Sequence, residues 1–148
     1  MTSAYFRANV GACVVDAQGH VLALKRKGTT YNAWQMPQGG IEEGETPAWA
    51  VMRELAEETG LTADDVTIVA EFPEWLAYEL PLAYRRPKVG WGQVQRWFLL
   101  RLTPGALVRP DGVEFEAFQF LPPGELMNRA VAFRRPVYEK VLAAFVPL

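Results

Sequence analysis

The stretch from Gly39 to Leu61 reads GGIEEGETPAWAVMRELAEETGL and is the most informative part of the chain. It fits the pattern G-x5-E-x7-R-E-U-x-E-E-x-G-U, with U apolar, at every constrained position. The positions that each demand a single residue type are Gly39, Glu45, Arg53, Glu54, Glu57, Glu58 and Gly60. Because an ordinary residue type occupies only about 7% of positions in proteins, an accidental match at all of them is improbable. We therefore interpret the stretch as a functional signature.

The middle of this stretch predicts a helix whose two ends are both marked in the sequence. Thr46 is suited to the N-cap and Pro47 to the first helical position, where a missing N–H costs nothing. The helix is expected to run to about Thr59, because Gly60 can adopt the left-handed conformation that ends a helix. Helical spacing places an apolar stripe on one side, formed by Ala48, Val51, Met52 and Leu55.

Three carboxylates stand on the adjoining side of the predicted helix. Glu54, Glu57 and Glu58 are spaced i, i+3 and i+4, so they share one arc of roughly 100 degrees and repel each other. A hard divalent cation with oxygen ligands, Mg²⁺ or Mn²⁺, would reverse that repulsion. A solvated acidic face, with Arg53 in a weak i,i+4 pair, is the alternative. It leaves the upstream glycine and glutamate of the pattern unexplained.

The completed pattern resembles the signature of the Nudix hydrolases, which cleave a nucleoside diphosphate linked to another group. The resemblance implies that Glu54, Glu57 and Glu58 bind about two or three divalent ions, with the backbone carbonyl of Gly39 as a further ligand. It also implies that Arg53 orients the preceding loop through Glu45. We accordingly expect the catalytic residues to include Glu57, Glu54, Arg53 and Glu45.

Length and composition are compatible with this interpretation. A chain of 148 residues that is 50% hydrophobic is expected to form one domain, spanning residues 1–148, with a real core. No apolar run approaches the roughly 20 residues of a membrane span, and the first residues lack the shape of a signal peptide. We expect a cytoplasmic protein. The single cysteine, Cys13, is predicted to be a core residue, and His20 a turn or surface residue.

The charge balance narrows the class of binding partner. A net charge of −2 and a pI near 5.5 argue against stable, nonspecific binding of long nucleic acid by charge alone. Local basic clusters remain, and each is either solvated surface or a phosphate contact. They are Lys25 to Lys27, Arg85 with Arg86 and Lys88, and Arg134 with Arg135.

The rest of the chain alternates predicted strands with few helices. Val10 to Val15 and Val21 to Leu24 flank a turn at residues 16–19, which is a hairpin signal. Helical spacing returns only near the end, from Pro136 to Phe145. This order predicts an α+β domain, and the resemblance sharpens it to an α/β/α sandwich with a mixed central sheet. Further strands are expected at Val66 to Phe72, Trp75 to Leu80, Val94 to Leu102 and Phe115 to Leu121.

Four segments outside the signature resemble one branch of the family, which contains the bacterial RNA pyrophosphohydrolases and the plant-type dinucleoside tetraphosphate hydrolases. They are Phe6–Gly11, Trp34–Gly40, Gly92–Phe98 and Val131–Tyr138. The opening differs slightly, because Phe6 replaces the usual tyrosine, with Tyr5 just before it. By this resemblance the substrate contacts are Arg7 and Tyr78 at the phosphates, Val131, Phe133 and Arg26 at a base-stacking cleft, and Gln95.

These aromatic and apolar residues also have structural interpretations. Trp34, Trp97 and Phe98 are of types more often found in a core than at a ligand, and Phe133 could staple the last helix. A further metal-binding carboxylate is expected from Glu114 or Glu116, which stand two apart at a strand start. Alignment on the Glu-Phe-acid tripeptide favours Glu114. Exposed charges at a strand edge are the alternative.

Three functional hypotheses follow from the sequence. The first is a hydrolase of RNA 5′ triphosphates or of dinucleoside tetraphosphates, in which water attacks a phosphorus inside the phosphate chain and Glu57 or Glu114 is the general base. The second is a housecleaning Nudix enzyme acting on free oxidised nucleotides or nucleotide sugars. The third is a non-catalytic module that binds nucleotides or RNA. The intact carboxylate set argues against the third, and the substrate contacts outside the signature argue against the second.

Overall fold

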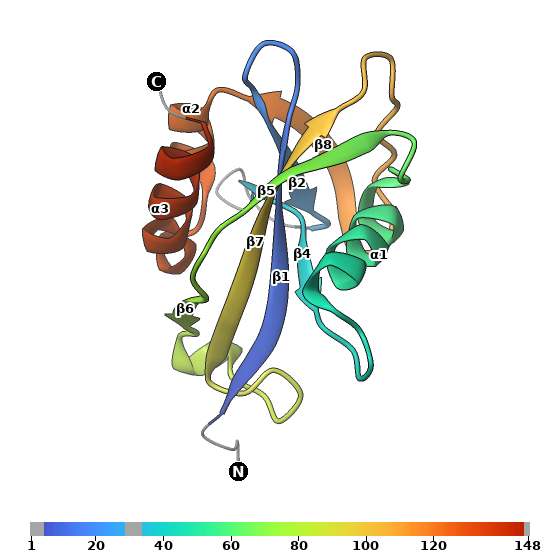
Figure 1. Cartoon of the computed structure of the whole chain (residues 1–148). Helices are drawn as coiled ribbons and strands as arrows, with labels where there is room; N and C mark the ends of the chain where they lie inside the picture. Colours follow the sequence, from blue (N-terminus) through green and yellow to red (C-terminus); the bar gives the residue numbers. More distant parts are fainter. Residues whose placement is uncertain (1–4, 29–33, 147–148) are drawn as a thin grey trace.

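The computed structural model describes residues 5–28 and 34–146, which form one mixed sheet with helices on both faces (Figure 1). Eight strands lie in these described residues. In chain order they are β1 (Phe6–Val15), β2 (Val21–Arg26), β3 (Trp34–Gln35), β4 (Gln38–Gly40), β5 (Val66–Glu71), β6 (Leu76–Glu79), β7 (Gly92–Leu102) and β8 (Phe115–Leu121). The helices are α1 (Pro47–Thr59), α2 (Pro123–Arg129) and α3 (Arg135–Phe145).

The centre of the sheet is a long parallel pairing between β1 and β7. Its register runs from Phe6 opposite Gly92 to Val15 opposite Arg101. The other strand pairs are antiparallel, and the main path across the sheet is β3-β2-β1-β7-β5. Three strands lie off this path, since β4 pairs with β1, β6 with β7 and β8 with β2. The mixed sheet predicted from the resemblance is thus confirmed.

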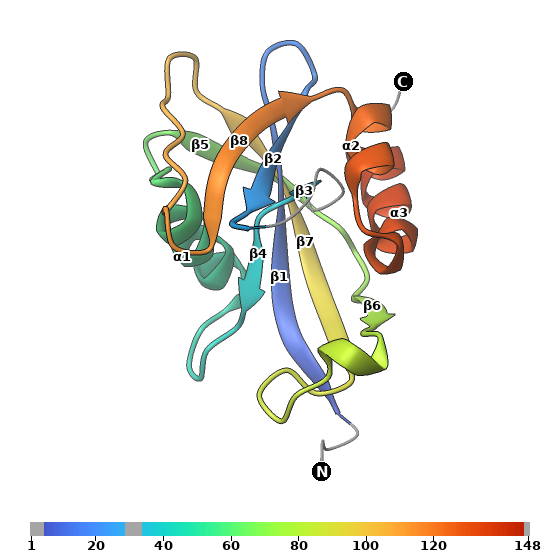
Figure 2. The ribbon, with the colours of Figure 1, turned by 180° about the vertical axis from the view of Figure 1, so that it is seen from behind.

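Alternate residues of the central strands serve two separate cores. Val10, Ala12 and Val14 of β1 pack on the face that α1 covers, together with Leu55 and Phe98. Cys13 points to the opposite face, which α2 and α3 cover, and is buried there as predicted. Figures 1 and 2 show the three layers, with α1 on one side of the sheet and α2 and α3 on the other. The α/β/α arrangement follows directly from this alternation.

Helix α1 begins and ends where the sequence predicts. The Thr46 side chain accepts a hydrogen bond from the Trp49 N–H at 3.2 Å, and Gly60 ends the helix with φ of 74°. The predicted apolar stripe is wrong at one position, because Ala48 is exposed and Ala50 is fully buried. The helix is turned slightly from the expected orientation, and this turn buries Glu58 along with Val51 and Leu55.

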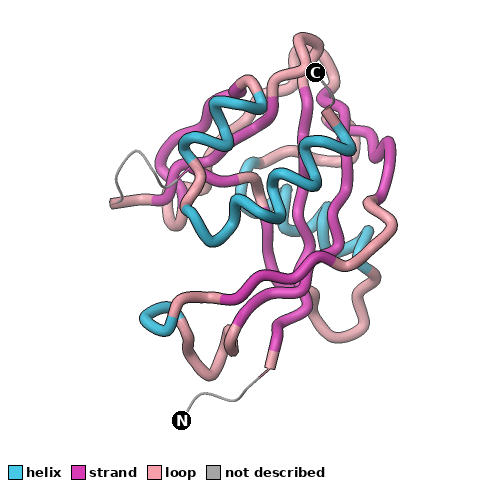
Figure 3. Tube along the Cα trace, turned by 90° about the vertical axis from the view of Figure 1, so that its left-hand side faces the viewer, coloured by secondary structure: helices cyan, strands magenta, loops and turns pink. Residues whose placement is uncertain are grey.

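The structure corrects several expected element boundaries. β1 starts at Phe6 rather than Val10, β7 at Gly92 rather than Val94, and α3 at Arg135 rather than Pro136. The short strands β3 and β4 and the helix α2 have no counterpart in the sequence prediction. Figure 3 views the molecule from the side that carries α2 and α3. No helix among residues 5–28 and 34–146 is long and apolar enough to cross a membrane.

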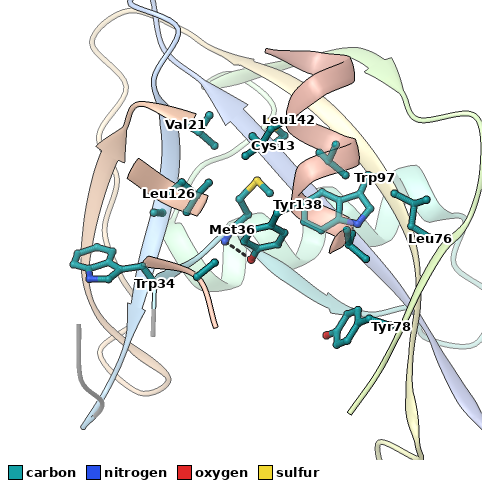
Figure 4. Close-up of a cluster of buried hydrophobic side chains, with 14 of the residues drawn as sticks. Cys13, Val21, Trp34, Met36, Leu76, Tyr78, Trp97, Leu126, Tyr138 and Leu142 are labelled. Atoms are coloured by element: carbon teal, nitrogen blue, oxygen red, sulfur yellow. Dashed lines mark hydrogen bonds between the residues drawn. The ribbon is translucent and has the colours of Figure 1, made fainter. Parts of the chain in front are cut away.

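A buried hydroxyl connects α3 to the segment before the signature. Tyr138 of α3 is buried, and its hydroxyl accepts a hydrogen bond of 2.8 Å from the Met36 N–H (Figure 4). Trp97 packs edge-on against the Tyr138 ring with centroids 5.8 Å apart, so both predicted core aromatics of β7, Trp97 and Phe98, are buried. Burial and this backbone contact fix the position of the chain just before Gly39.

Candidate active site

A cavity of about 910 Å³ opens where the ends of β1, β4, β6 and β7 meet α1 and the segment before α3. Acidic residues and aromatic residues form two distinct parts of its lining. Glu54, Glu57 and Gly39 form one part of its wall, together with Glu114. Aromatic and apolar side chains form another part, with Tyr78, Tyr84, Val131 and Phe133. A single cavity thus combines an acidic wall and a ring-lined wall.

Two consecutive glycines form the floor of the acidic part. β4 pairs with β1, with Gly39 opposite Val10 and Gly40 opposite Asn9. A β-carbon at Gly39 would lie 2.0 Å from Cδ of Glu54, and one at Gly40 would lie 2.1 Å from a terminal nitrogen of Arg7. The Glu54 carboxylate and the Arg7 guanidinium therefore rest directly on bare backbone, and only glycine leaves room for them.

Arg53 links the helix to the loop before it. It donates to both carboxylate oxygens of Glu45, through Nε at 2.6 Å and Nη2 at 2.8 Å, and its Nη2 also donates to the Gly40 carbonyl at 2.9 Å. On the cavity side its Nη1 donates to Glu54 at 2.9 Å and to Glu57 at 3.3 Å. The guanidinium lowers the pKa of Glu45 to about 2. The geometry matches a positioning role for Arg53 and Glu45 behind the cavity wall.

The carboxylates of α1 differ sharply in burial. The Glu57 side chain is 58% exposed, whereas Glu58 is buried and accepts a 3.3 Å hydrogen bond from the Gln38 N–H. Burial raises the pKa of Glu58 to about 9, and the nearby Glu114 and Glu54 carboxylates add to the effect. Burial also raises the pKa of Glu54, although Arg53 opposes that shift. Charging all of these groups requires additional positive charge in the cavity.

The donor chemistry of this wall fits a hard divalent ion. Glu54, Glu57 and Glu114 supply carboxylate oxygens, and Gly39 has no side chain of its own to keep the Glu54 carboxylate away from the backbone. Within the described part of the chain, three ligand side chains are not yet gathered as a ready-made metal site, and Arg53 engages both Glu54 and Glu57. An ion that binds here would have to compete with the Arg53 guanidinium for those two carboxylates.

The two glutamates at the start of β8 have different surroundings. Glu114 lines the cavity and forms an ion pair of 3.2 Å with Arg26. Glu116 pairs with Lys25 at 3.5 Å and accepts a hydrogen bond from the Gly28 N–H, outside the cavity lining. The register between β2 and β8 shifts at Lys25 and Arg26, which separates the two carboxylates. Glu114 remains the predicted further ligand.

A cluster of rings forms the other part of the cavity. Phe133, in the 3₁₀ helix η3 (Ala132–Arg134), lies between two tyrosines, with centroid distances of 5.8 Å to Tyr78 and 5.5 Å to Tyr84. Tyr84 ends another 3₁₀ helix, η2 (Leu82–Tyr84), and is 54% exposed. Tyr84 was not predicted from the sequence, because its contact with Phe133 joins segments about 50 residues apart.

Cations line the same cavity. Arg7, Lys88 and Arg134 all line the cavity, and within residues 5–28 and 34–146 none of them forms an ion pair with a carboxylate. The Nε atom of Arg134 is buried without a hydrogen-bond partner in the described structure. Such charges are suited to the oxygen atoms of a polyphosphate.

The structure does not bring Gln95, a predicted substrate contact, to the cavity. Gln95 is fully buried behind the wall, where its amide nitrogen donates to Asn9 at 2.8 Å and to Gln38 at 3.2 Å. Its carbonyl oxygen accepts from Trp97 Nε1 at 3.0 Å. Gln93, two residues earlier on the same face of β7, lines the cavity instead, and its buried Oε1 atom has no hydrogen-bond partner among residues 5–28 and 34–146. The alternation of residues along β7 predicted that Gln93 and Gln95 share one face of the strand, but not which of the two reaches the cavity.

Comparison with known proteins shows the family of the chain. The family model described as NUDIX domain matches residues 5–141. An RNA pyrophosphohydrolase from Acinetobacter baylyi is 44% identical over 144 residues, which cover 93% of this chain and 86% of that protein. One from Aeromonas hydrophila is 41% identical and covers 97% and 85%. Nudix hydrolase 26, chloroplastic, from Arabidopsis thaliana is 41% identical and covers 95% and 69%.

Solved structures resemble the chain in fold at lower sequence identity. The E. coli dihydroneopterin triphosphate pyrophosphohydrolase aligns with a TM-score of 0.76 and 22% identity, covering 94% of this chain and 98% of that one. A C. elegans Ap4A hydrolase, in a binary complex, aligns with a TM-score of 0.71 and 21% identity, covering 93% and 96%. These structures share the same layered architecture.

Proposed function

Because the chain belongs to the Nudix family of hydrolases, we propose that it is a Mg²⁺- or Mn²⁺-dependent pyrophosphohydrolase that acts on the 5′ end of RNA or on dinucleoside tetraphosphates. The whole chain then acts as one Nudix domain. The relatives at 41% and 44% identity that are named RNA pyrophosphohydrolase support the first substrate class. The likeness in fold to an Ap4A hydrolase is compatible with the second.

The observation that carries this proposal is the composition of the cavity. Glu54 and Glu57 lie on one wall and Phe133 stands among tyrosines on another. Cations such as Arg7, which forms no ion pair within the described residues, line the same cavity. Both proposed substrates contain a phosphate chain attached to nucleoside bases. Cations suit the phosphates, and rings suit the bases, because aromatic side chains stack on any base.

The metal ligands in this proposal are Glu54, Glu57, Glu58 and Glu114, with the Gly39 carbonyl. Bound divalent ions, about two or three, would neutralise phosphate charge and lower the pKa of water. The high pKa of Glu58 and the raised pKa of Glu54 support this assignment, because a nearby cation would relieve the cost of charging both.

The remaining chemistry is a hydrolysis. The oxygen of a water attacks a phosphorus inside the phosphate chain, the anhydride P–O bond on the far side breaks, and the departing phosphate takes the bonding electrons. A carboxylate accepts the proton of the water, and Glu57 and Glu114 are the candidates. In this proposal Arg7, Lys88, Arg134 and Tyr78 contact the phosphates, while Val131, Phe133 and Arg26, which line the same cavity, contact the nucleoside part.

A side-by-side assay in labelled water tests the proposal. The substrates are a 5′-triphosphorylated RNA, diadenosine tetraphosphate and an oxidised nucleoside triphosphate, each with Mg²⁺ and with Mn²⁺. We expect kcat/KM for one of the first two to exceed that for the free nucleotide at least tenfold, and the label identifies the phosphorus attacked. A preference for the free nucleotide would favour a housecleaning enzyme. No turnover of any substrate would favour a non-catalytic module.

A further inference from the structure

A loop of residues 81–91 stands beside the cavity and combines exposed rings with unpaired cations. Leu82, Tyr84 and Trp91 are 80%, 54% and 37% exposed. Arg85, Arg86 and Lys88 lie between the two rings, and within residues 5–28 and 34–146 no carboxylate pairs with any of the three. The sequence has no Asp or Glu between Glu79 and Asp111. The loop is therefore a local positive surface on a chain of net charge −2.

Hydrogen bonds connect this loop to itself and to Tyr5. The Gly90 N–H donates to the Arg86 carbonyl at 2.7 Å, and the Trp91 N–H donates to the Tyr5 carbonyl at 2.8 Å. The Tyr5 hydroxyl donates to the Pro87 carbonyl. Gly90 has a φ of 69°, and a β-carbon there would lie 2.4 Å from the Tyr5 carbonyl oxygen, so glycine is required. These contacts define the backbone path of the loop between β6 and β7 (Figures 1 and 2).

The loop is continuous with the cavity wall. Tyr84, Lys88 and Val89 line the cavity, whereas Arg86 and Trp91 lie outside the lining. Arg85 connects the two parts, because its Nε donates to the Leu80 carbonyl at 2.8 Å and its guanidinium lies 4.7 Å from the Trp91 ring centroid. A nucleotide chain that leaves the ring-lined wall would meet cations and rings next.

Cavity size requires such an exit if the substrate is an RNA. A cavity of about 910 Å³ is of the size that takes one small molecule, so later nucleotides must lie outside it. Single-stranded nucleic acid is typically bound by cations that follow the backbone and by rings on which bases stack. We propose that the 81–91 loop binds the part of an RNA substrate that extends beyond the cavity. The inference rests on the proposed function, within which it favours RNA.

Charge reversal at Arg86 tests the inference, because this exposed residue lies outside the cavity lining. Arg101→Glu is the matched control. It makes the same charge change at an exposed position of β7, about 30 Å along the strand from Gly92 at roughly 3.3 Å per residue. The substrates are triphosphorylated RNAs of two and twenty nucleotides and diadenosine tetraphosphate. The full-length protein is used throughout.

We expect Arg86→Glu to lower kcat/KM for the twenty-nucleotide RNA at least fivefold and to leave the other two substrates within twofold. The dependence of log kcat/KM on log salt for the long RNA should also become shallower, by about 0.7 or more per lost phosphate contact. Three results would overturn the inference. They are equal effects on kcat/KM for all three substrates, an unchanged kcat/KM for the twenty-nucleotide RNA, or the same result for Arg101→Glu. An unchanged kcat/KM for the twenty-nucleotide RNA would instead favour an acidic protein as the binding partner of this surface.

A binding measurement separates this inference from the proposed function. Fluorescence anisotropy with a 5′-hydroxyl twenty-nucleotide RNA and no divalent metal involves no bond cleavage. We expect Arg86→Glu to raise Kd at least fivefold. Weakened binding in a protein that fails to hydrolyse RNA would support the surface and contradict the proposed substrate. Unchanged binding in a protein that does hydrolyse RNA would overturn the surface alone.

Discussion

The Glu54 carboxylate lies directly against the backbone of Gly39, so that a β-carbon at Gly39 would be 2.0 Å from Glu54 Cδ. No rotation of a methyl group relieves a contact of that kind. The glutamate must move, or β4 must separate from β1 where Gly39 pairs with Val10. The glycine of the signature is therefore a spatial requirement of the glutamate fifteen residues later.

Gly39→Ala should consequently lower kcat by about a hundredfold, because displacement of a catalytic carboxylate by about 1 Å has effects of that order. Gly124→Ala is the matched control, since a β-carbon at Gly124 meets no atom within 4 Å and alanine suits helix α2. Steady-state kinetics on both variants, with melting temperatures, provide the comparison. Equal kcat values for the two would show that the contact is unimportant.

The buried Glu58 should make the metal-free protein less stable as the pH rises. Its pKa is raised from 4.5 to about 9, so between these values the folded state retains a proton that the unfolded state has lost. The free energy of unfolding then falls as the pH rises through this window. Glu58→Gln should raise the metal-free melting temperature at pH 8 by about 3 °C or more, equivalent to roughly 1 kcal/mol, and should reduce the gain from added Mg²⁺.

Scanning calorimetry in EDTA, with and without excess Mg²⁺, measures both effects. Glu139→Gln serves as the control, because Glu139 is exposed on α3. A metal-free Glu58→Gln protein that melts below the wild type at pH 8 would contradict this account of Glu58.

The glutamines of β7 should differ in the property that they affect. Gln95→Leu leaves hydrogen-bonding groups of Asn9, Gln38 and Trp97 without their partner, so the free energy of unfolding should fall by about 2 to 3 kcal/mol. Gln93→Leu removes an acceptor that has no donor in the part of the chain that the structure describes, so the free energy of unfolding should change by less than about 1 kcal/mol while KM rises. Urea unfolding and kinetics distinguish them. A reversal of the two patterns would place Gln95 at the substrate.

The ring at Phe133 should contribute to binding rather than to bond cleavage. Phe133→Ala should raise KM about tenfold with kcat nearly unchanged, because stacking on an aromatic side chain contributes about 1 to 3 kcal/mol per base. Phe118→Ala is the control, since Phe118 is a partly exposed ring of β8 outside the cavity lining. A drop in kcat without a change in KM would instead indicate a structural role for Phe133.

The sequence was most informative where one residue determines local structure. Thr46, Pro47 and Gly60 specified both ends of α1, and the turn after Val15 specified the β1–β2 connection. Helix α2 was missed because Pro122, Pro123 and Gly124 resemble a turn. The parallel pairing of β1 with β7 was also not predicted, since it depends on contacts between residues about 86 positions apart.

In the site, the sequence pattern predicted which side of a helix or strand a residue occupies better than how deeply its side chain is buried. Glu57 and Glu58 are adjacent, yet one is exposed and the other is buried, because α1 is turned so that Ala50 rather than Ala48 meets the sheet. The position of Tyr84 in the cavity and the burial of Gln95 also could not be predicted from the sequence pattern. Their positions depend on which segments pack together across the sheet, and a linear pattern carries little of that information.

If the carboxylates of α1 form a catalytic metal site, the decisive measurement is kcat of Glu57→Gln at saturating Mg²⁺. The Glu57 side chain is 58% exposed, so the melting temperature should stay within about 2 °C of wild type. Glu43→Gln, at an exposed position outside the cavity lining, is the control. We expect kcat to fall by about a hundredfold or more for Glu57→Gln and to stay unchanged for Glu43→Gln. A Glu57→Gln enzyme within a few-fold of wild type would contradict this expectation.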